Sequence, residues 1–138
     1  MRRLIYGSVL AMLLTGPGLA QEGLAPDAAI EGTIQSQIDA FLLDDFGAAF
    51  EFAGPGIQSM FRTPENFGAM VQNGYPMVHR PQDLRFGELR EISGALWQKV
   101  IVQDSDGRTH VLDYRMGEYE DGWRIDGVQI LPAPDVSA

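Results

Sequence analysis

The chain has 138 residues, a formal net charge of −9 and no cysteine. This length fits a single domain, and the lack of cysteine leaves it without disulfides or thiolate metal ligands. The acidity disfavours binding to the phosphates of nucleic acids and to anionic lipid headgroups. Arg80, Arg85 and Arg90 are too sparse to form a basic patch. We therefore expect no nucleic acid partner.

The first twenty residues have the pattern of a secretory signal peptide. Arg2 and Arg3 supply a positive start, residues 4–14 form an apolar run, and residues 18–20 form a small-residue exit ending at Ala20. A membrane anchor is the alternative, but the apolar run is shorter than the roughly 20 residues that a spanning helix needs. We expect cleavage near Ala20, export to the periplasm or the extracellular space, and no membrane anchor.

The first half of the mature chain has the periodicity of helices. A lead-in at residues 21–29 is expected to be flexible. Apolar residues then recur at three- and four-residue steps over 30–42 and again over 46–53, which places each set on one helical face. Asp44 or Asp45 can cap the second of these helices.

A further helix and a connector complete this half. After a short turn at residues 57–61, Thr63 and Pro64 supply a hydroxyl cap followed by proline at the first helical position. The helix that starts there is expected to end at Gly74. Residues 75–83 contain two prolines and are expected to form an extended connector or an edge strand.

The second half has the alternation of β-strands, separated by turn sequences that contain glycine. Four strands are expected, at residues 84–92, 95–103, 108–119 and 123–131. Helices followed by an antiparallel meander define an α+β class. We expect one domain over residues 30–131, with the N-terminal helices packed on one face of a curved four-stranded antiparallel sheet, and a disordered tail at 132–138.

Two Asp-Gly turns predict the register of the strands. If Asp106-Gly107 and Asp121-Gly122 are two-residue turns, Ile101 lies opposite Leu112. A slip of one residue would exchange the two faces of the sheet. The helix-facing side is then Trp97, Ile101, Leu112, Tyr114, Met116, Trp123, Ile125 and Leu131. The outer side carries six aliphatic residues, Leu96, Val100, Val102, Val111, Val128 and Ile130.

Six aliphatic residues on an open sheet face need to be covered. Helices can cover only one side, so the outer face must be closed by the lead-in and tail or by a second subunit. We expect a homodimer through this face.

Helices over one side of a curved sheet that ends in DGWRIDGV, residues 121–128, resemble the nuclear transport factor 2-like superfamily of cone-shaped α+β domains. Residues 34–61, 64–78 and 121–128 also resemble a small family of secreted bacterial proteins described as a domain of unknown function. The superfamily resemblance implies an apolar interior pocket and frequent dimerisation. It implies no activity, because the superfamily includes isomerases, dehydratases, binding modules and domains that only bind partners.

The pocket implied by this resemblance is expected to hold a small apolar ligand. Its expected wall is Phe41, Phe46, Phe50, Phe67, Tyr75, Trp97, Tyr114, Met116 and Trp123. Enzymes with such cones resemble one another in using Asp, His or Tyr for proton transfer. The candidates here are His110, Tyr114 and His79, although no motif forces an acid beside a base.

Other chemistry has little support in the sequence. The DSDG segment lacks the acid spacing of a calcium loop, and two distant histidines without cysteine indicate no transition-metal site. We expect a non-catalytic, secreted module that binds a small ligand or a protein partner and uses no cofactor. The alternative is a cofactor-free isomerase, lyase or hydrolase that uses a His–Tyr pair.

Overall fold

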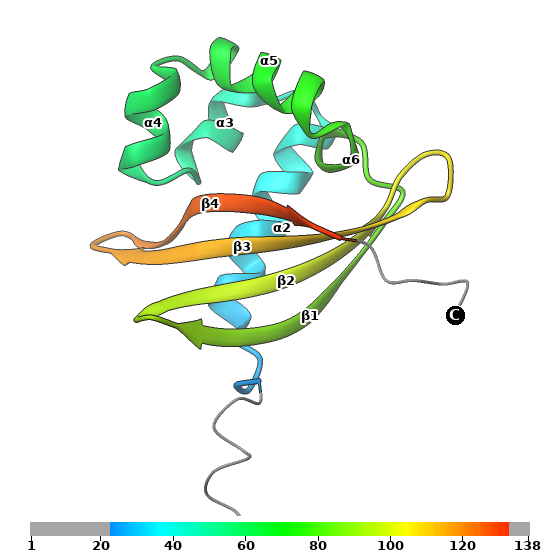
Figure 1. Ribbon diagram of the computed structural model, residues 1–138. Helices are drawn as coiled ribbons and strands as arrows, with labels where there is room; N and C mark the ends of the chain where they lie inside the picture. The colour runs from blue at the N-terminus through cyan, green and yellow to red at the C-terminus, as the bar shows by residue number, and fades with distance from the viewer. Residues whose placement is uncertain (1–22, 133–138) are drawn as a thin grey trace, which may run out of the picture.

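The computed structural model describes residues 23–132, in which a set of helices precedes a four-stranded sheet (Figure 1). The expected signal peptide at 1–20 and the tail beyond residue 132 lie outside the described residues. The elements are α2 (Ala28–Leu42), α3 (Phe46–Glu51), α4 (Pro55–Phe61), α5 (Pro64–Gly74), α6 (Pro76–His79), β1 (Asp83–Ile92), β2 (Ala95–Gln103), β3 (Thr109–Tyr119) and β4 (Gly122–Leu131). The predicted α+β class is confirmed.

The helices begin where side chains can bond the free amides of a first turn. Asp27 accepts from two amides at 2.9 and 3.1 Å and starts α2 at Ala28. Asp45 caps α3 at 3.0 Å, and Thr63 caps α5 at 3.1 Å. Each cap satisfies donors that a helix start leaves unpaired, so these boundaries follow directly from the local sequence.

Two segments differ from expectation. The sequence predicts a flexible lead-in at 21–29, but among its described residues, from 23 onward, the amide of Leu24 donates to the carbonyl of Leu89 at 2.7 Å and α2 already begins at residue 28. The connector at 75–83 contains the short helix α6 and is not simply extended. Pro76 occupies its first position, where a missing N–H costs nothing.

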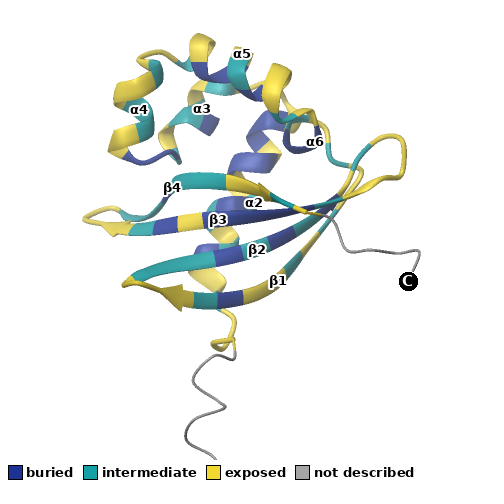
Figure 2. Cartoon of the chain, in the orientation of Figure 1, coloured by how far each residue is buried: buried dark blue, intermediate teal, exposed yellow. Residues whose placement is uncertain are grey.

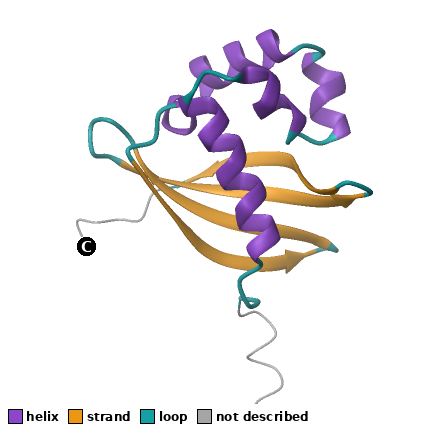
Figure 3. Ribbon diagram, turned by 180° about the vertical axis from the view of Figure 1, so that it is seen from behind, coloured by secondary structure: helices purple, strands orange, loops and turns teal. Residues whose placement is uncertain are grey.

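The sheet is an antiparallel meander in the order β1-β2-β3-β4. Helix α2 crosses one of its faces (Figure 3), and the shorter helices gather on the side of β4 (Figure 1). The link before α4 attaches the shorter helices to the edge strand β4. There, Gly54 donates to the carbonyl of Ile125 at 2.7 Å, and the Ile125 amide donates to Phe52 at 2.8 Å. Buried residues concentrate where α2 meets the middle strands (Figure 2).

The predicted register of β2 and β3 is wrong by one residue. Ile101 lies opposite Val111, not opposite Leu112. The connecting turn is the cause. The Asp104 amide donates to the Arg108 carbonyl at 2.9 Å, and Gly107 has a φ of 84°. Three residues therefore lie between the closing pair, a hairpin loop one residue longer than the predicted Asp-Gly turn.

Because of this one-residue difference, each residue of β2 lies on the face opposite to the one predicted for it. Trp97, predicted to lie beneath the helices, shares the outer face with its partner Arg115, whereas Trp123 keeps its helix-facing side. Val100 and Val102, predicted to be on the outer face, are 0% exposed within the core. The aliphatic outer patch is therefore wrong as predicted. On β2, Leu96, Val100 and Val102 lie on the helix-facing side. On β4, Val128 and Ile130 also lie on that side, because a bulge between Arg115 and Met116 shifts the β3–β4 pairing as well. Of the six only Val111 faces outward.

Candidate functional site

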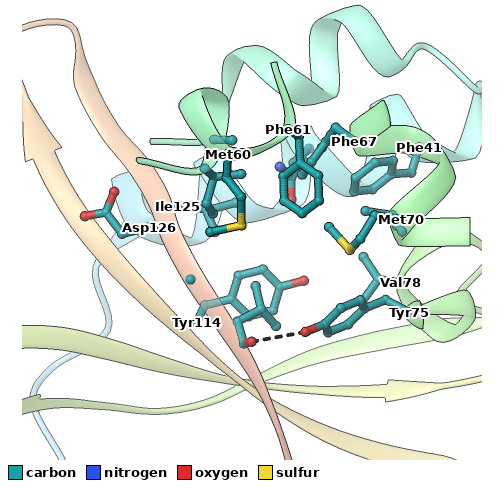
Figure 4. A pocket seen from close by; sticks show the side chains of 16 residues that line it. Phe41, Met60, Phe61, Phe67, Met70, Tyr75, Val78, Tyr114, Ile125 and Asp126 are labelled. Carbon is teal, nitrogen blue, oxygen red and sulfur yellow. Dashed lines mark hydrogen bonds between the residues drawn. The ribbon is translucent and has the colours of Figure 1, made fainter. Parts of the chain in front are cut away.

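A cavity of about 320 Å³ lies between the helices and the β3–β4 side of the sheet. Helices α2, α4, α5 and α6 supply one wall, and β3 and β4 supply the other (Figure 4). Its volume is at the lower end of the range for ligand pockets. The labelled lining residues are Phe41, Met60, Phe61, Phe67, Met70, Tyr75, Val78, Tyr114, Ile125 and Asp126.

Phe67 on α5 organises the aromatic part of the wall. Its ring centroid lies 5.8 Å from that of Phe41, 5.3 Å from Phe50 and 5.9 Å from Phe61. Tilted and edge contacts at such distances suit the charge distribution of aromatic rings. The cluster joins α2, α3, α4 and α5, so the same contacts that hold the helices together shape the cavity.

Part of the expected pocket wall lines this cavity and part does not. Phe41, Phe67, Tyr75 and Tyr114 line it. Phe46 and Phe50 pack against the core and Met116 is buried within it, but none of the three lines the cavity.

The two tryptophans lie elsewhere. Trp123 lines a separate groove together with Thr33 and Arg124. Trp97 is on the outer face, opposite Arg115. The prediction placed it beneath the helices because its β2–β3 pairing was one residue out of register. The prediction that both indoles lie beneath the helical layer is therefore wrong.

Helix α4 contributes wall residues that were not predicted. Ile57, Met60 and Phe61 line the cavity, and Met60 is 71% exposed and marks its mouth. Their three- and four-residue spacing is visible in the sequence. In so short a helix, however, this spacing does not indicate whether the apolar side faces a cavity or solvent, and in the structure none of its residues is fully buried.

Tyr114 closes the cavity on the side of the sheet. The residue is fully buried, and its hydroxyl has no hydrogen-bond partner among the described residues. Burial, with a smaller contribution from the nearby Tyr75, raises the pKa of the Tyr114 phenol far above its ordinary value. Tyr114 therefore keeps its proton. Tyr75 donates to the carbonyl of Val128 over a long 3.4 Å (Figure 4).

The structure does not place either candidate histidine against Tyr114. His110 lies near the β2–β3 turn, with Nε2 2.8 Å from Asp104. His79 lies on α6, with Nε2 2.8 Å from Asp44 and its ring stacked on Phe46. Neither lines the cavity. The described residues thus do not assemble a His–Tyr pair for proton transfer.

The single carboxylate of the wall is turned away from the cavity. Asp126 accepts two contacts from the hydroxyl of Tyr119, at 2.9 and 3.1 Å, and points outward (Figure 4). Over residues 23–132 there is no group of three or more acidic, histidine or cysteine side chains placed to hold a metal ion. No helix in that range combines the length and the apolarity needed to cross a bilayer.

The fold and the cavity define a small α+β domain that encloses an apolar pocket between its helices and an open antiparallel sheet. The chain belongs to the family described as a domain of unknown function (DUF4864), whose model matches residues 24–138. This agrees with the resemblance to a domain of unknown function noted from the sequence. Searches of curated proteins and of solved structures found no match.

Proposed function

We propose that this chain is an exported binding module that holds a small, mainly apolar molecule in the cavity. The observation that carries the proposal is the cavity itself. Its walls are mainly aromatic, methionine and aliphatic side chains; the amide of Gln37 also lines it and donates to the carbonyl of Ala49 at 3.0 Å, and in the described chain its one charged lining residue, Asp126, faces away. Apolar walls with few polar groups are typical of small-molecule sites.

The size of the cavity supports a ligand. Protein cores are packed to nearly crystalline density, and unfilled apolar volume loses dispersion contacts along its walls. An apolar cavity of about 150 Å³ is enough to bind benzene, and this one measures about 320 Å³. A molecule of one or two fused rings, or a short branched chain, would fit this volume.

Helix α4 gives the cavity a route to solvent. None of its residues is fully buried, and it is joined to α5 through Arg62, whose φ is 72°. A positive φ is unfavourable for a residue with a side chain, so the chain turns sharply at this joint between the two helices. Met60 lies over the mouth with a flexible thioether that can adapt to different shapes.

Export and superfamily membership belong to the same proposal. Export is supported by the signal peptide pattern of residues 1–20. Assignment to the nuclear transport factor 2-like superfamily is supported by the helix-then-sheet order and by an apolar cavity between these two parts. The enzyme alternative has less support, because neither histidine lines the cavity.

Native mass spectrometry of the protein purified from the cells that produce it tests the proposal. Met70→Trp should block the cavity, because Met70 lines it and is partly buried. Leu43→Trp adds the same indole at an exposed position outside the cavity and serves as the control. We expect a bound small molecule on the wild type and on Leu43→Trp but not on Met70→Trp. A wild-type protein with no added mass, or equal occupancy in Met70→Trp, would contradict the proposal.

A further inference from the structure

The hydroxyl of Tyr114 is the polar group of the cavity that lacks a partner. Tyr114 is 0% exposed, and its hydroxyl makes no hydrogen bond among residues 23–132. Buried hydroxyls are nearly always paired, because losing water without a replacement is costly. Phenylalanine would fill the same space without that cost. A tyrosine at this position therefore points to a partner that is not part of the chain.

The rest of the wall shows which charge that partner carries. Among the described residues, no lysine, arginine or histidine lines the cavity. A carboxylate or phosphate placed there would lose its hydration and find no counter-ion. A cation would fare no better, because the carboxylate of Asp126 is engaged by Tyr119 outside the cavity. An uncharged molecule is the class that these walls accept.

The state of Tyr114 shows which hydrogen-bonding group fits. Burial raises the pKa of its phenol, so the group carries its proton and can donate. The neighbouring Tyr75 already directs its own proton to the Val128 carbonyl. An acceptor oxygen on the ligand satisfies Tyr114 without bringing another donor into the cavity.

We propose that the cavity selects uncharged apolar molecules that carry one carbonyl oxygen, with the hydroxyl of Tyr114 donating a hydrogen bond to that oxygen. This inference rests on the proposed function and adds the ligand class to it. The hydroxyl is enclosed, so the ligand reaches it by displacing a flexible neighbour. Met70, whose flexible thioether lies on the helical wall of the cavity (Figure 4), is suited to that movement.

Three probes with one ring system and different head groups test the inference. Naphthalene has no polar group, 2-acetylnaphthalene has a neutral carbonyl, and 2-naphthoate has a charged carboxylate. Their affinities are measured by titration calorimetry on the wild type, on Tyr114→Phe and on Thr109→Val. Thr109 is exposed at the start of β3 and does not line the cavity, so its variant is the control for loss of a hydroxyl elsewhere on the same strand.

The wild type and Thr109→Val should bind the ketone about tenfold more tightly than naphthalene, which is the value of one good hydrogen bond. Both proteins should bind 2-naphthoate more weakly than the ketone. Tyr114→Phe should lose the preference for the ketone while its affinity for naphthalene is retained, which also shows that the variant is folded.

Four other results would overturn the inference. Equal affinity for naphthalene and the ketone in the wild type would remove the selection but leave ligand binding, and with it the proposed function, intact. A preference for 2-naphthoate, or a ketone preference that survives in Tyr114→Phe, would likewise contradict the proposed selection and leave ligand binding intact. Absence of saturable binding for all three probes would instead remove the proposed function along with the inference.

Discussion

Arg90 and Asp113 form a two-pronged ion pair across the intervening strand β2, with both N–O distances at 2.8 Å. Arg90 is on β1 and Asp113 is on β3, and Arg90 also donates to the carbonyl of Trp97 on β2 at 3.3 Å. The side chains are only 16% and 7% exposed. The pair therefore ties three strands together on the face opposite the cavity.

Asp113→Leu is expected to lower the free energy of unfolding by about 2–3 kcal/mol, because it leaves the partly buried guanidinium of Arg90 without its counter-ion. The double variant Arg90→Leu with Asp113→Leu should recover much of that loss, because no charge is then stranded. Urea denaturation of the two single variants and the double variant provides the comparison. If the two single losses simply add up in the double variant, the pair is not coupled as described.

Tyr114→Phe is expected to raise the free energy of unfolding by about 1 kcal/mol, because it removes a buried hydroxyl that has no partner. Tyr119→Phe removes a hydroxyl that does have a partner, the carboxylate of Asp126, and should instead lower the same quantity by up to about 1 kcal/mol. Both are measured by urea denaturation without ligand. A clear loss of stability in Tyr114→Phe would show that the hydroxyl has a structural partner.

Gly68→Ala is expected to destabilise the protein by about 1–3 kcal/mol through overpacking. A Cβ atom at Gly68 would lie 2.7 Å from the ring of Phe46, at the contact between α5 and α3. Gly32→Ala in α2 is the control, because its Cβ would meet nothing within 4 Å. That change should stabilise the helix by up to about 1 kcal/mol. The two melting temperatures should therefore move in opposite directions, and a shift of the same sign in both would count against the packing described.

The fold class could be predicted because its signals act over a few residues. The caps at Asp45 and Thr63 and the helical periodicity over 30–42 place most elements within one or two residues of their observed bounds. The register could not be predicted in this way. The DSDG segment is compatible with a two-residue or a three-residue loop.

A side-chain contact decides between these two loops. Oδ1 of Asp104 accepts from the amides of Asp106 and Arg108, both at 2.9 Å, which favours the longer turn. The predicted placement of pocket residues on the helices and on β3, such as Phe67 and Tyr114, does not depend on the β2–β3 register, and both line the cavity, whereas the predicted face of Trp97 on β2 is wrong. The homodimer remains a prediction, but it can no longer be argued from an aliphatic outer face.

The ion pair at Asp44 should make the protein sensitive to acid. Asp44 joins the end of α2 to α6 by bonding His79 at 2.8 Å and Arg80 twice at 2.9 Å. The bond from His79, followed by that from Arg80, lowers the pKa of Asp44 below its ordinary value of 3.8. A carboxyl group with a lowered folded-state pKa stabilises the protein above its unfolded pKa, and this contribution is lost as the pH falls through the folded value.

Asp44→Asn is therefore expected to be less stable than the wild type at about pH 5, with a smaller difference at about pH 3. Asparagine tolerates the positive φ of 56° at this position, so the backbone is not a confounding factor. The urea midpoints of the two proteins at the two pH values provide the measurement. A difference that is as large at the lower pH as at the higher one would show that the Asp44 carboxylate is not its source.

The occupied cavity can be observed directly by NMR of methionine methyl groups during titration with 2-acetylnaphthalene. Met60 and Met70 line the cavity, whereas Met77 and Met116 are buried elsewhere in the core. A bound aromatic ring should shift the first two methyl signals to saturation and leave the other two nearly unchanged. Signals that do not move, or four signals that move alike, would contradict ligand binding in this cavity.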